Sequence, residues 1–396
     1  MKNHTNRPNL FCFSALACLF LPPVARGDEV ALASGSVGLT VGDGSSSAAN
    51  PSYKVASFGI AGEATYTGSV ASVSGNVLTF ETSTDSDAVT INPFTPNALA
   101  AGVAYLKAAF SGGKVTGITD ADGDSISGTN TESSGLDNAN PPTITIEDPD
   151  TGEDVATATA TLSGGKITGV TVTNQGSGYT AEPSVTVDCG PHVIRLTAGS
   201  GDQGRCFLIT ANTGTTITVD NPNSENLSSI FTSDTTVEIL RASTLGELFG
   251  VSSASPLQSG TPSTADYVYL WSQSRGFFVN YFHFGGNGSF PKGWYDRTSI
   301  FSGAKNDLVV YPDEAFVIAR RTGSEINISF EGYAVTTDQK LQLPASGSQY
   351  LMNNPFGTDM FLCELISSAD ISSNSSGANW TKKFKTGTTG NDGSDG

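Results

Sequence analysis

Two runs of alternating residues flank a tight turn in Gly68-Ser-Val-Ala-Ser-Val-Ser-Gly75-Asn76-Val-Leu-Thr-Phe80, and this stretch decides the fold class. Successive side chains of a β-strand point to opposite faces, so apolar residues at every second position predict a strand with one buried face. Gly-Asn between two such runs is a hairpin signal, because these residues tolerate the left-handed backbone of a tight turn. The stretch therefore predicts an antiparallel β-hairpin.

The same strand character continues along the chain, for example at residues 215–219 and 235–240. Glycine accounts for 45 of the 396 residues and charged residues for only 15%, a composition typical of short strands joined by many turns. The best helix candidate is residues 244–249, where a Thr and a Glu three residues later form a capping-box pattern. Residues 98–109 are ambiguous. Their alanines favour a helix, whereas the alternation of apolar and polar side chains favours a strand. We predict an all-β protein.

An internal repeat organises the middle of the chain. Ala108-Ala-Phe-Ser-Gly-Gly-Lys-Val-Thr-Gly-Ile-Thr119 recurs as Ala160-Thr-Leu-Ser-Gly-Gly-Lys-Ile-Thr-Gly-Val-Thr171, and each copy is followed by a shorter matching segment, at 142–146 and 183–187. Apolar residues alternate on both sides of Ser-Gly-Gly-Lys, so each copy predicts a small antiparallel β unit. We expect the two copies to pack on each other.

The repeat interrupts the first of two predicted domains. We expect both domains to be β-sandwiches or barrel-like, because short strands with turns every ~8 to 12 residues are typical of these folds. The full division is a signal peptide at 1–27, a flexible N-terminal segment at 28–49, the first β domain at 50–98 plus 190–242, the inserted two-copy β-hairpin repeat at 99–189, the second β domain at 243–371 and a disordered tail at 372–396.

The sequence carries two resemblances to known proteins. Gly176-Ser-Gly-Tyr-Thr-Ala-Glu-Pro183, in the second copy, resembles a Gly-Ser-Gly-Tyr-Thr-x-x-Pro repeat of tail-fibre-like and bacterial surface proteins, which implies a spacer or a binding scaffold. The second resemblance is carried by Gly204-Arg-Cys-Phe-Leu-Ile-Thr-Ala-Asn212, Thr244-Leu-Gly-Glu-Leu-Phe249, and Ala265-Asp-Tyr-Val-Tyr-Leu-Trp271 with Gly293-Trp294. With the rest of 50–90 and 190–370, these residues resemble an uncharacterised family of exported β-rich proteins, expanded as paralogues in Verrucomicrobia. That resemblance implies export and no particular activity.

The N-terminus predicts export. Two basic residues precede an apolar run over 10–25, which is followed by Arg26 and Gly27. The run is shorter than the roughly 20 residues of a membrane-spanning helix and has the order of a signal peptide, so we place cleavage near Gly27. Lipidation at Cys18 is the alternative, but Ala15-Leu16-Ala17 before it is a poor lipobox. We predict a secreted or cell-envelope protein with no membrane span after cleavage.

The formal charge of −18 argues against nucleic acid as a partner, because phosphate contacts need clustered Lys and Arg. So much acid suits solubility outside the cell or the capture of divalent cations. Asp120, Asp122 and Asp124 alternate around a glycine, and such carboxylates can converge on Ca²⁺, whose ligands are oxygens. These three residues are the predicted metal ligands. The alternative is an acidic rim of a long loop, because the bidentate glutamate of an EF-hand is missing.

Cys189 and Cys206 are candidate partners in a disulfide. They flank a segment with strand, turn and strand character, and an oxidising compartment would favour their pairing. Cys363 lies in the apolar run Met360-Phe-Leu-Cys363, so a buried free thiol is the simpler prediction for it.

Aromatic side chains crowd residues 267–295. Trp271, Trp294 and Tyr295 are a candidate platform on which a glycan stacks. The alternative is core packing, because aromatic residues load both faces of the strand predicted near 277–284, and a strand loaded on both faces is buried. Exposure of the three side chains beside a groove would favour the platform, and burial of all three would remove its basis.

No catalytic motif stands out in the sequence. His192 and His283 lie far from any Gly-x-Ser-x-Gly pattern, so a histidine-based triad is not predicted. The sequence also lacks a Walker loop, a dinucleotide fingerprint and a Cys or His zinc pattern. A glycosidase pair of carboxylates could come from anywhere in the chain. Among the acids, Asp313, Glu314 and Glu331 are expected to be solvated charges at turns and strand edges.

The leading hypothesis is a non-enzymatic, exported surface or extracellular structural protein of the adhesion type. Its inserted repeat would extend outward and bind Ca²⁺ or another surface protein. The alternative is a carbohydrate-binding module or a carbohydrate-active protein of the cell envelope, with a cell-surface glycan as its partner.

Overall fold

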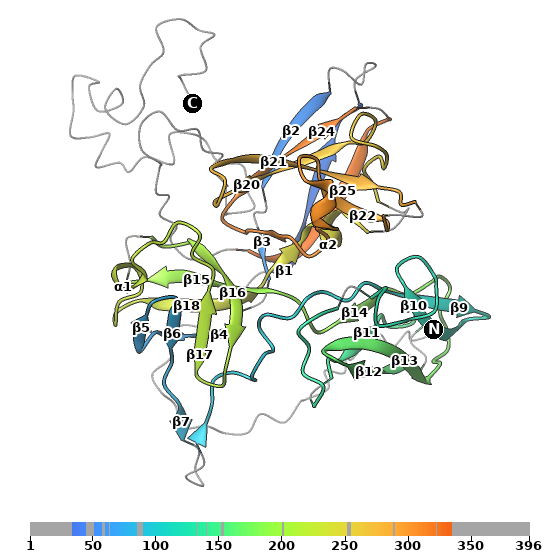
Figure 1. The fold of residues 1–396 in the computed structure, drawn as a ribbon. Helices are drawn as coiled ribbons and strands as arrows, with labels where there is room; N and C mark the ends of the chain where they lie inside the picture. The colour runs from blue at the N-terminus through green and yellow to red at the C-terminus, as the bar shows by residue number, and fades with distance from the viewer. Residues whose placement is uncertain are drawn as a thin grey trace, which may run out of the picture. The chain divides into compact units, whose positions relative to one another are not determined.

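The computed structural model describes residues 34–44, 51–57, 60–62, 64–84, 90–131, 133–139, 141–151, 154–199, 202–251, 255–287, 290–321 and 323–334. Strands make up 45% of the structure and helices 5%, in several antiparallel sheets (Figure 1). The predicted all-β class is confirmed. The predicted signal peptide at 1–27, Cys363 and the predicted tail at 372–396 lie outside the described residues.

Seven strands form one antiparallel sheet in the order β4-β18-β15-β16-β17-β6-β5 (Figure 1). They are β4 (Ala64–Ser69), β5 (Ser72–Ser74), β6 (Val77–Thr79), β15 (His192–Ala198), β16 (Cys206–Asn212), β17 (Thr216–Val219) and β18 (Thr236–Arg241). The predicted hairpin is β5 with β6: Ser74 pairs with Val77, and Gly75 has the positive φ of 59° that a tight turn favours. Leu78, Ile194 and Ile217 are fully buried in a common cluster on this sheet.

A second antiparallel sheet has five strands in the order β2-β24-β20-β21-β22. They are β2 (Ser52–Ser57), β20 (Tyr267–Ser272), β21 (Phe277–Phe284), β22 (Gly293–Asp296) and β24 (Ala315–Arg320). Its residues belong to two different hydrophobic clusters: Val268 and Phe316 lie in one, and Tyr267 and Phe282 in the other. Neighbouring residues of a strand point to opposite faces, so both faces of this sheet are packed. This is why its strands are rich in aromatic residues throughout.

Strands near the N-terminus pair with strands of the C-terminal half. β1 (Ser34–Val41) pairs along its whole length with β25 (Ile326–Ala334), which also pairs with β3 (Ile60–Ala61), while β2 pairs with β24. Part of the predicted flexible segment 28–49 is therefore a strand. Within the segment predicted to start the first domain, β2 and β3 pair with these C-terminal strands, and the strands of the seven-stranded sheet begin with β4. The buried side chain of Val41 contributes to the same cluster as Phe316.

The residues of the two repeat copies fold as a hairpin and a four-stranded sheet. In the hairpin, β9 (Leu106–Ser111) pairs with β10 (Lys114–Asp120). The sheet has the order β13-β12-β11-β14, with β11 (Ile144–Ile146), β12 (Thr157–Ser163), β13 (Lys166–Asn174) and β14 (Val185–Val187). Both glycines of each Ser-Gly-Gly-Lys turn have positive φ, a conformation that disfavours a side chain. Val115 of the first copy and Tyr179 of the second lie in one hydrophobic cluster, so the copies share a core.

The remaining elements are short. Helix α2 (Leu245–Phe249) is the predicted helix, and Thr244 and Glu247 form the predicted capping box. The others are α1 (Leu227–Ile230), the 3₁₀ turn η1 (Ile300–Ser302), β7 (Ser83–Thr84), β8 (Thr90–Ile91), β19 (Ser243–Thr244) and β23 (Val309–Val310). Within the described ranges, no helix is both long and apolar enough to cross a membrane.

Candidate functional site

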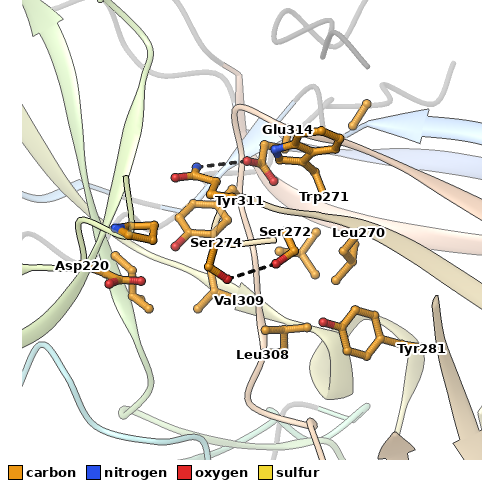
Figure 2. Close-up of a pocket in the computed structure, with 15 residues that line it drawn as sticks. Asp220, Leu270, Trp271, Ser272, Ser274, Tyr281, Leu308, Val309, Tyr311 and Glu314 are labelled. Atoms are coloured by element: carbon orange, nitrogen blue, oxygen red, sulfur yellow. Dashed lines mark hydrogen bonds between the residues drawn. The ribbon is translucent and has the colours of Figure 1, made fainter. Parts of the chain in front are cut away.

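A cavity of about 180 Å³ opens between segments of the seven-stranded and five-stranded sheets. Its lining comes from β16, the residues after β17, β20 with the turn that follows it, β21, and the segment that enters β24. The polar and aromatic side chains that line it are Asp220, Ser272, Gln273, Ser274, Glu314, Trp271, Tyr281 and Tyr311 (Figure 2). We call this cavity the Glu314 cleft.

A four-residue turn brings Glu314 into the cleft. In Tyr311-Pro-Asp-Glu314 the N–H of Glu314 donates a hydrogen bond of 3.2 Å to the Tyr311 carbonyl, and proline at the second position has the φ angle that such a turn needs. Strand β24 begins at the next residue, so Glu314 lies on the same side of the chain as the fully buried Phe316. The turn therefore places a carboxyl group among apolar neighbours.

Asp313 joins this turn to the seven-stranded sheet. Its Oδ2 accepts a hydrogen bond of 2.9 Å from the N–H of Cys206, at the start of β16. Its Oδ1 is buried without a hydrogen-bond partner in the part of the chain that the structure describes. Burial raises the pKa of Asp313 to about 6, although the Cys206 N–H and the nearby Arg205 act in the opposite direction. The protein thus compensates the charge of this carboxyl group only in part.

Glu314 is the buried acid of the cleft, with an exposed fraction of 9%. Its Oε1 accepts a hydrogen bond of 3.2 Å from Gln273 Nε2 (Figure 2). Burial and then the neighbouring Asp313 raise the pKa of Glu314 to about 8, and the Gln273 amide offsets them only in part. The prediction that Asp313 and Glu314 are solvated charges is therefore wrong, because the turn directs both carboxyl groups inward. The side chain of Glu331 lies outside the described residues.

Tyr311 lies between the two acids that line the cleft, as Figure 2 shows for Asp220 and Glu314. Burial raises the pKa of Tyr311, and the charges of Glu314 and Asp220 raise it further. The Tyr311 hydroxyl therefore stays neutral and can donate or accept a hydrogen bond. Asp220 is exposed at the rim, where its N–H donates to the Leu208 carbonyl at 2.8 Å.

The predicted platform of Trp271, Trp294 and Tyr295 does not form as one surface. Trp294 is 0% exposed and Tyr295 2%, and they lie in the two different clusters of the five-stranded sheet. Trp294 Nε1 donates to the Gly250 carbonyl at 2.7 Å, so its polar group is satisfied inside the core. Trp271 is half-buried and lines the Glu314 cleft. Trp294 and Tyr295 are thus core residues, and Trp271 alone of the three lines a cavity.

Asp120, Asp122 and Asp124 do not converge on a metal position. Asp120 Oδ1 accepts hydrogen bonds from the N–H groups of Asp122 at 3.0 Å and Asp124 at 2.8 Å, and its Oδ2 accepts one from Asn130 at 2.7 Å. Asp122 Oδ1 lies 2.7 Å from Lys292 Nζ. Across the described ranges, no group of three or more His, Cys, Asp or Glu side chains is placed to hold a metal ion. Asp120 is 5% exposed, and its carboxylate shapes the loop by accepting these three hydrogen bonds.

Cys189 and Cys206 are buried free thiols, so the structure lacks the predicted disulfide. Cys206 pairs across the sheet with Arg195, whereas Cys189 precedes His192, the first residue of β15. His192 to Arg195 alone spans about 10 Å of strand, and a disulfide needs Cα atoms within about 7 Å of each other. Burial raises the pKa of Cys189 to about 11 and raises that of Cys206 well above its ordinary value, which suits unreactive thiols.

One serine lies against a histidine, Ser259 Oγ being 2.6 Å from His283 Nδ1. His283 Nε2 lies 3.1 Å from the Val251 carbonyl, which can only accept, so Nδ1 is the acceptor for the Ser259 hydroxyl. Burial lowers the pKa of His283, which is 0% exposed, and neither residue lines the Glu314 cleft. We interpret this pair as hydrogen bonding that satisfies a buried histidine.

The Glu314 cleft offers aromatic rings, neutral hydroxyls, an amide and a buried acid around one small volume. Of these residues, the sequence predicts only Trp271 as a contact for a ligand, because an acid in a Pro-Asp-Glu turn is ordinarily solvated and gives no signal of burial. No known protein family, curated protein or solved structure matches the chain. The two resemblances in the sequence therefore stay predictions.

Proposed function

We propose that the protein is an exported, non-enzymatic surface protein that binds a sugar residue in the Glu314 cleft. The observation that carries the proposal is that aromatic rings and hydrogen-bonding side chains line the same cavity. A sugar has apolar C–H faces and outward hydroxyls, so ring faces interspersed with polar groups are its complementary surface. Trp271 and Tyr311 would supply ring surface, and Gln273 and Glu314 would supply hydrogen bonds.

The size of the cleft supports a ligand of about one sugar unit. Its volume of about 180 Å³ is below the ~300 Å³ at the lower end of pockets for drug-sized molecules. The end of a glycan chain or a short branch would enter, and the rest of the glycan would stay in solvent. Recognition of chain ends is consistent with a protein that attaches to a surface.

Two further features support an exported protein with a scaffold or spacer. The signal-peptide pattern at residues 1–27 supports export to a compartment where cell-surface glycans are available. The two copies of the insertion at 99–189 share a hydrophobic cluster, so the insertion is a packed unit rather than a loose loop. This packing supports the spacer or scaffold role that its resemblance implies.

A glycan-array screen followed by isothermal titration calorimetry on the full chain tests the proposal. We expect Trp271→Ala and Tyr311→Ala each to weaken binding of the best glycan by about tenfold or more. The matched control is Phe301→Ala, because Phe301 is 85% exposed and does not line the cleft. Absence of any glycan ligand, or binding that both cleft variants leave unchanged, would contradict the proposal.

A further inference from the structure

Carboxyl groups line the Glu314 cleft without a cation among them. Asp220 and Glu314 contribute side chains, and none of the described residues that line the cavity is Lys, Arg or His. The negative charge of an acidic ligand would therefore lie close to the carboxylate of Asp220. No cationic side chain among these lining residues would pair with it. Like charges brought together during binding lower affinity and act as a specificity device.

Three arginines around the cleft are already paired. Arg275 follows the lining residue Ser274, and its Nη2 lies 2.8 Å from Asp296 Oδ2. Arg205, next to β16, has its Nη2 at 2.5 Å from Glu225 Oε1 and lies over the ring of Phe207. Arg195 on β15 has its Nη2 at 2.6 Å from Glu238 Oε2. All three guanidinium groups thus pair with carboxylates of the protein, and moving any of them to an acidic ligand would break an existing ion pair.

When Asp313 and Glu314 together hold a single proton, their hydrogen bonds favour its location on Glu314. Asp313 accepts the Cys206 N–H and lies near Arg205, and both of these favour its ionised form. Glu314 has only the neutral Gln273 amide as a donor in the described structure, and it lies on the side of Phe316. Two adjacent buried carboxyl groups do not both ionise readily, so the one with the weaker compensation keeps the proton.

We infer that the Glu314 cleft selects an uncharged sugar over an acidic one, with the protonated carboxyl of Glu314 donating a hydrogen bond to the ligand. This inference rests on the proposed function and adds the ligand class and a dependence on pH. The charged and titratable groups around Glu314 are Asp313 and Tyr311 of its own turn, Asp220 and Tyr281 in the lining of the cleft, Arg275 after the lining Ser274, and Cys206 with Arg205 behind Asp313. Burial raises the pKa of Tyr281, so this hydroxyl stays neutral. Tyr311 and Cys206 stay neutral in the relevant range because burial raises both pKa values. The raised pKa of Glu314 places the loss of its donor proton near pH 8.

Calorimetry with matched sugars tests the inference on the full chain. The probes are glucose against glucuronic acid and galactose against galacturonic acid, each pair differing only by the acidic group. We expect the better neutral sugar to bind at least about tenfold more tightly than its uronic acid at about pH 6.5, because the acid meets Asp220. Affinity of the wild type for the neutral sugar should fall about tenfold by about pH 9.5, as Glu314 loses its proton.

Two variants separate the inference from the proposal beneath it. Glu314→Gln keeps a neutral donor at all pH values, so its affinity for the neutral sugar should stay level from about pH 6.5 to about pH 9.5. Asp220→Asn should narrow the gap between the neutral sugar and the uronic acid. Equal or tighter binding of uronic acids, or the same alkaline loss in Glu314→Gln as in the wild type, overturns the inference and leaves glycan binding intact. If neither these sugars nor any arrayed glycan binds at either pH, the proposed function itself fails.

Discussion

Asp313 Oδ2 accepts a hydrogen bond of 2.9 Å from the backbone N–H of Cys206, and this bond ties the turn of the Glu314 cleft to the seven-stranded sheet. The same turn buries the neighbouring carboxyl of Glu314, whose donor is the Gln273 amide. Two carboxyl groups held this way repel each other when both are ionised. The folded protein therefore favours the form that keeps a proton, and its stability should depend on pH.

Replacing Glu314 by Gln should make stability less dependent on pH. The folded pKa of about 8 lies above the ~4.3 of an unfolded Glu, so the stabilisation is fully present below about pH 4 and is lost as pH rises through about 8. Between about pH 5 and about pH 9 the wild-type free energy of unfolding should fall by ~2 to 4 kcal/mol, and that of Glu314→Gln should fall clearly less. Urea unfolding at a series of pH values measures both.

The matched control for this experiment is Glu182→Gln. Glu182 is an exposed acid in the second repeat copy, and its Oε1 lies 3.3 Å from Lys107 Nζ. Exposed ion pairs contribute little, so the pH profile of this variant should follow the wild type. A Glu314→Gln profile that also follows the wild type would assign the pH dependence to other groups.

Two tryptophans of the predicted platform should respond differently to truncation. Trp294→Ala should lower the free energy of unfolding by ~3 to 5 kcal/mol, because the fully buried ring packs on Phe249 and its Nε1 bonds to Gly250. Trp271→Ala should cost less than about 2 kcal/mol, because Trp271 is half-buried at the cleft. Chemical denaturation checks both values. Similar losses would contradict the division between core and cleft.

The stability of the loop at residues 120–130 should depend on the carboxylate of Asp120 and not on bound calcium. Asp120→Ala should lower the free energy of unfolding by ~1 to 3 kcal/mol, because two backbone N–H groups and Asn130 lose their acceptor. Asp122→Asn should change it by less than about 1 kcal/mol, since the pair with Lys292 is partly exposed. Thermal unfolding with and without added calcium completes the test. A rise in midpoint with calcium that Asp122→Asn or Asp124→Asn abolishes would restore the metal site.

Cys189, between β14 and β15, and Cys206, at the start of β16, should both be free thiols. We expect Cys189 and Cys206 to resist alkylation in the native protein, because both are buried and burial raises their pKa values. In denaturant, without a reducing agent, both should be alkylated in full, as mass spectrometry of the peptides can show. A disulfide-linked peptide that contains the two cysteines would contradict the register of β15 with β16.

Strand β1 should contribute to stability although it lies in a segment predicted to be flexible. Val41→Ala should lower the free energy of unfolding by ~1 to 3 kcal/mol, because Val41 is 2% exposed and packs in the cluster of Phe316. Val55→Ala on β2 is a suitable control, because Val55 is 54% exposed. Urea unfolding of the two variants measures the difference. Equal, small effects would show that β1 adds little to the core.

The Glu314 cleft could not be predicted from the sequence. Asp313 meets the N–H of a residue 107 positions earlier, and no local pattern records that contact. Acids in a turn are usually solvated, so Asp313 and Glu314 give the same sequence signal whether water or β16 covers them. Trp271 and Trp294 likewise share an aromatic-rich segment and differ only in what packs on them.

By itself the sequence determined the all-β class, the hairpin at 68–80, the two Ser-Gly-Gly-Lys turns and the capping box of α2. These features depend on alternation, turn glycines and contacts between residues a few positions apart, so the local chain specifies them. Only the tertiary structure decided that β1 pairs with β25, and that two acids and a tryptophan lie at one cavity. The reason is physical: strand pairing and burial depend on which distant segments pack together, and alternation alone does not name the partner.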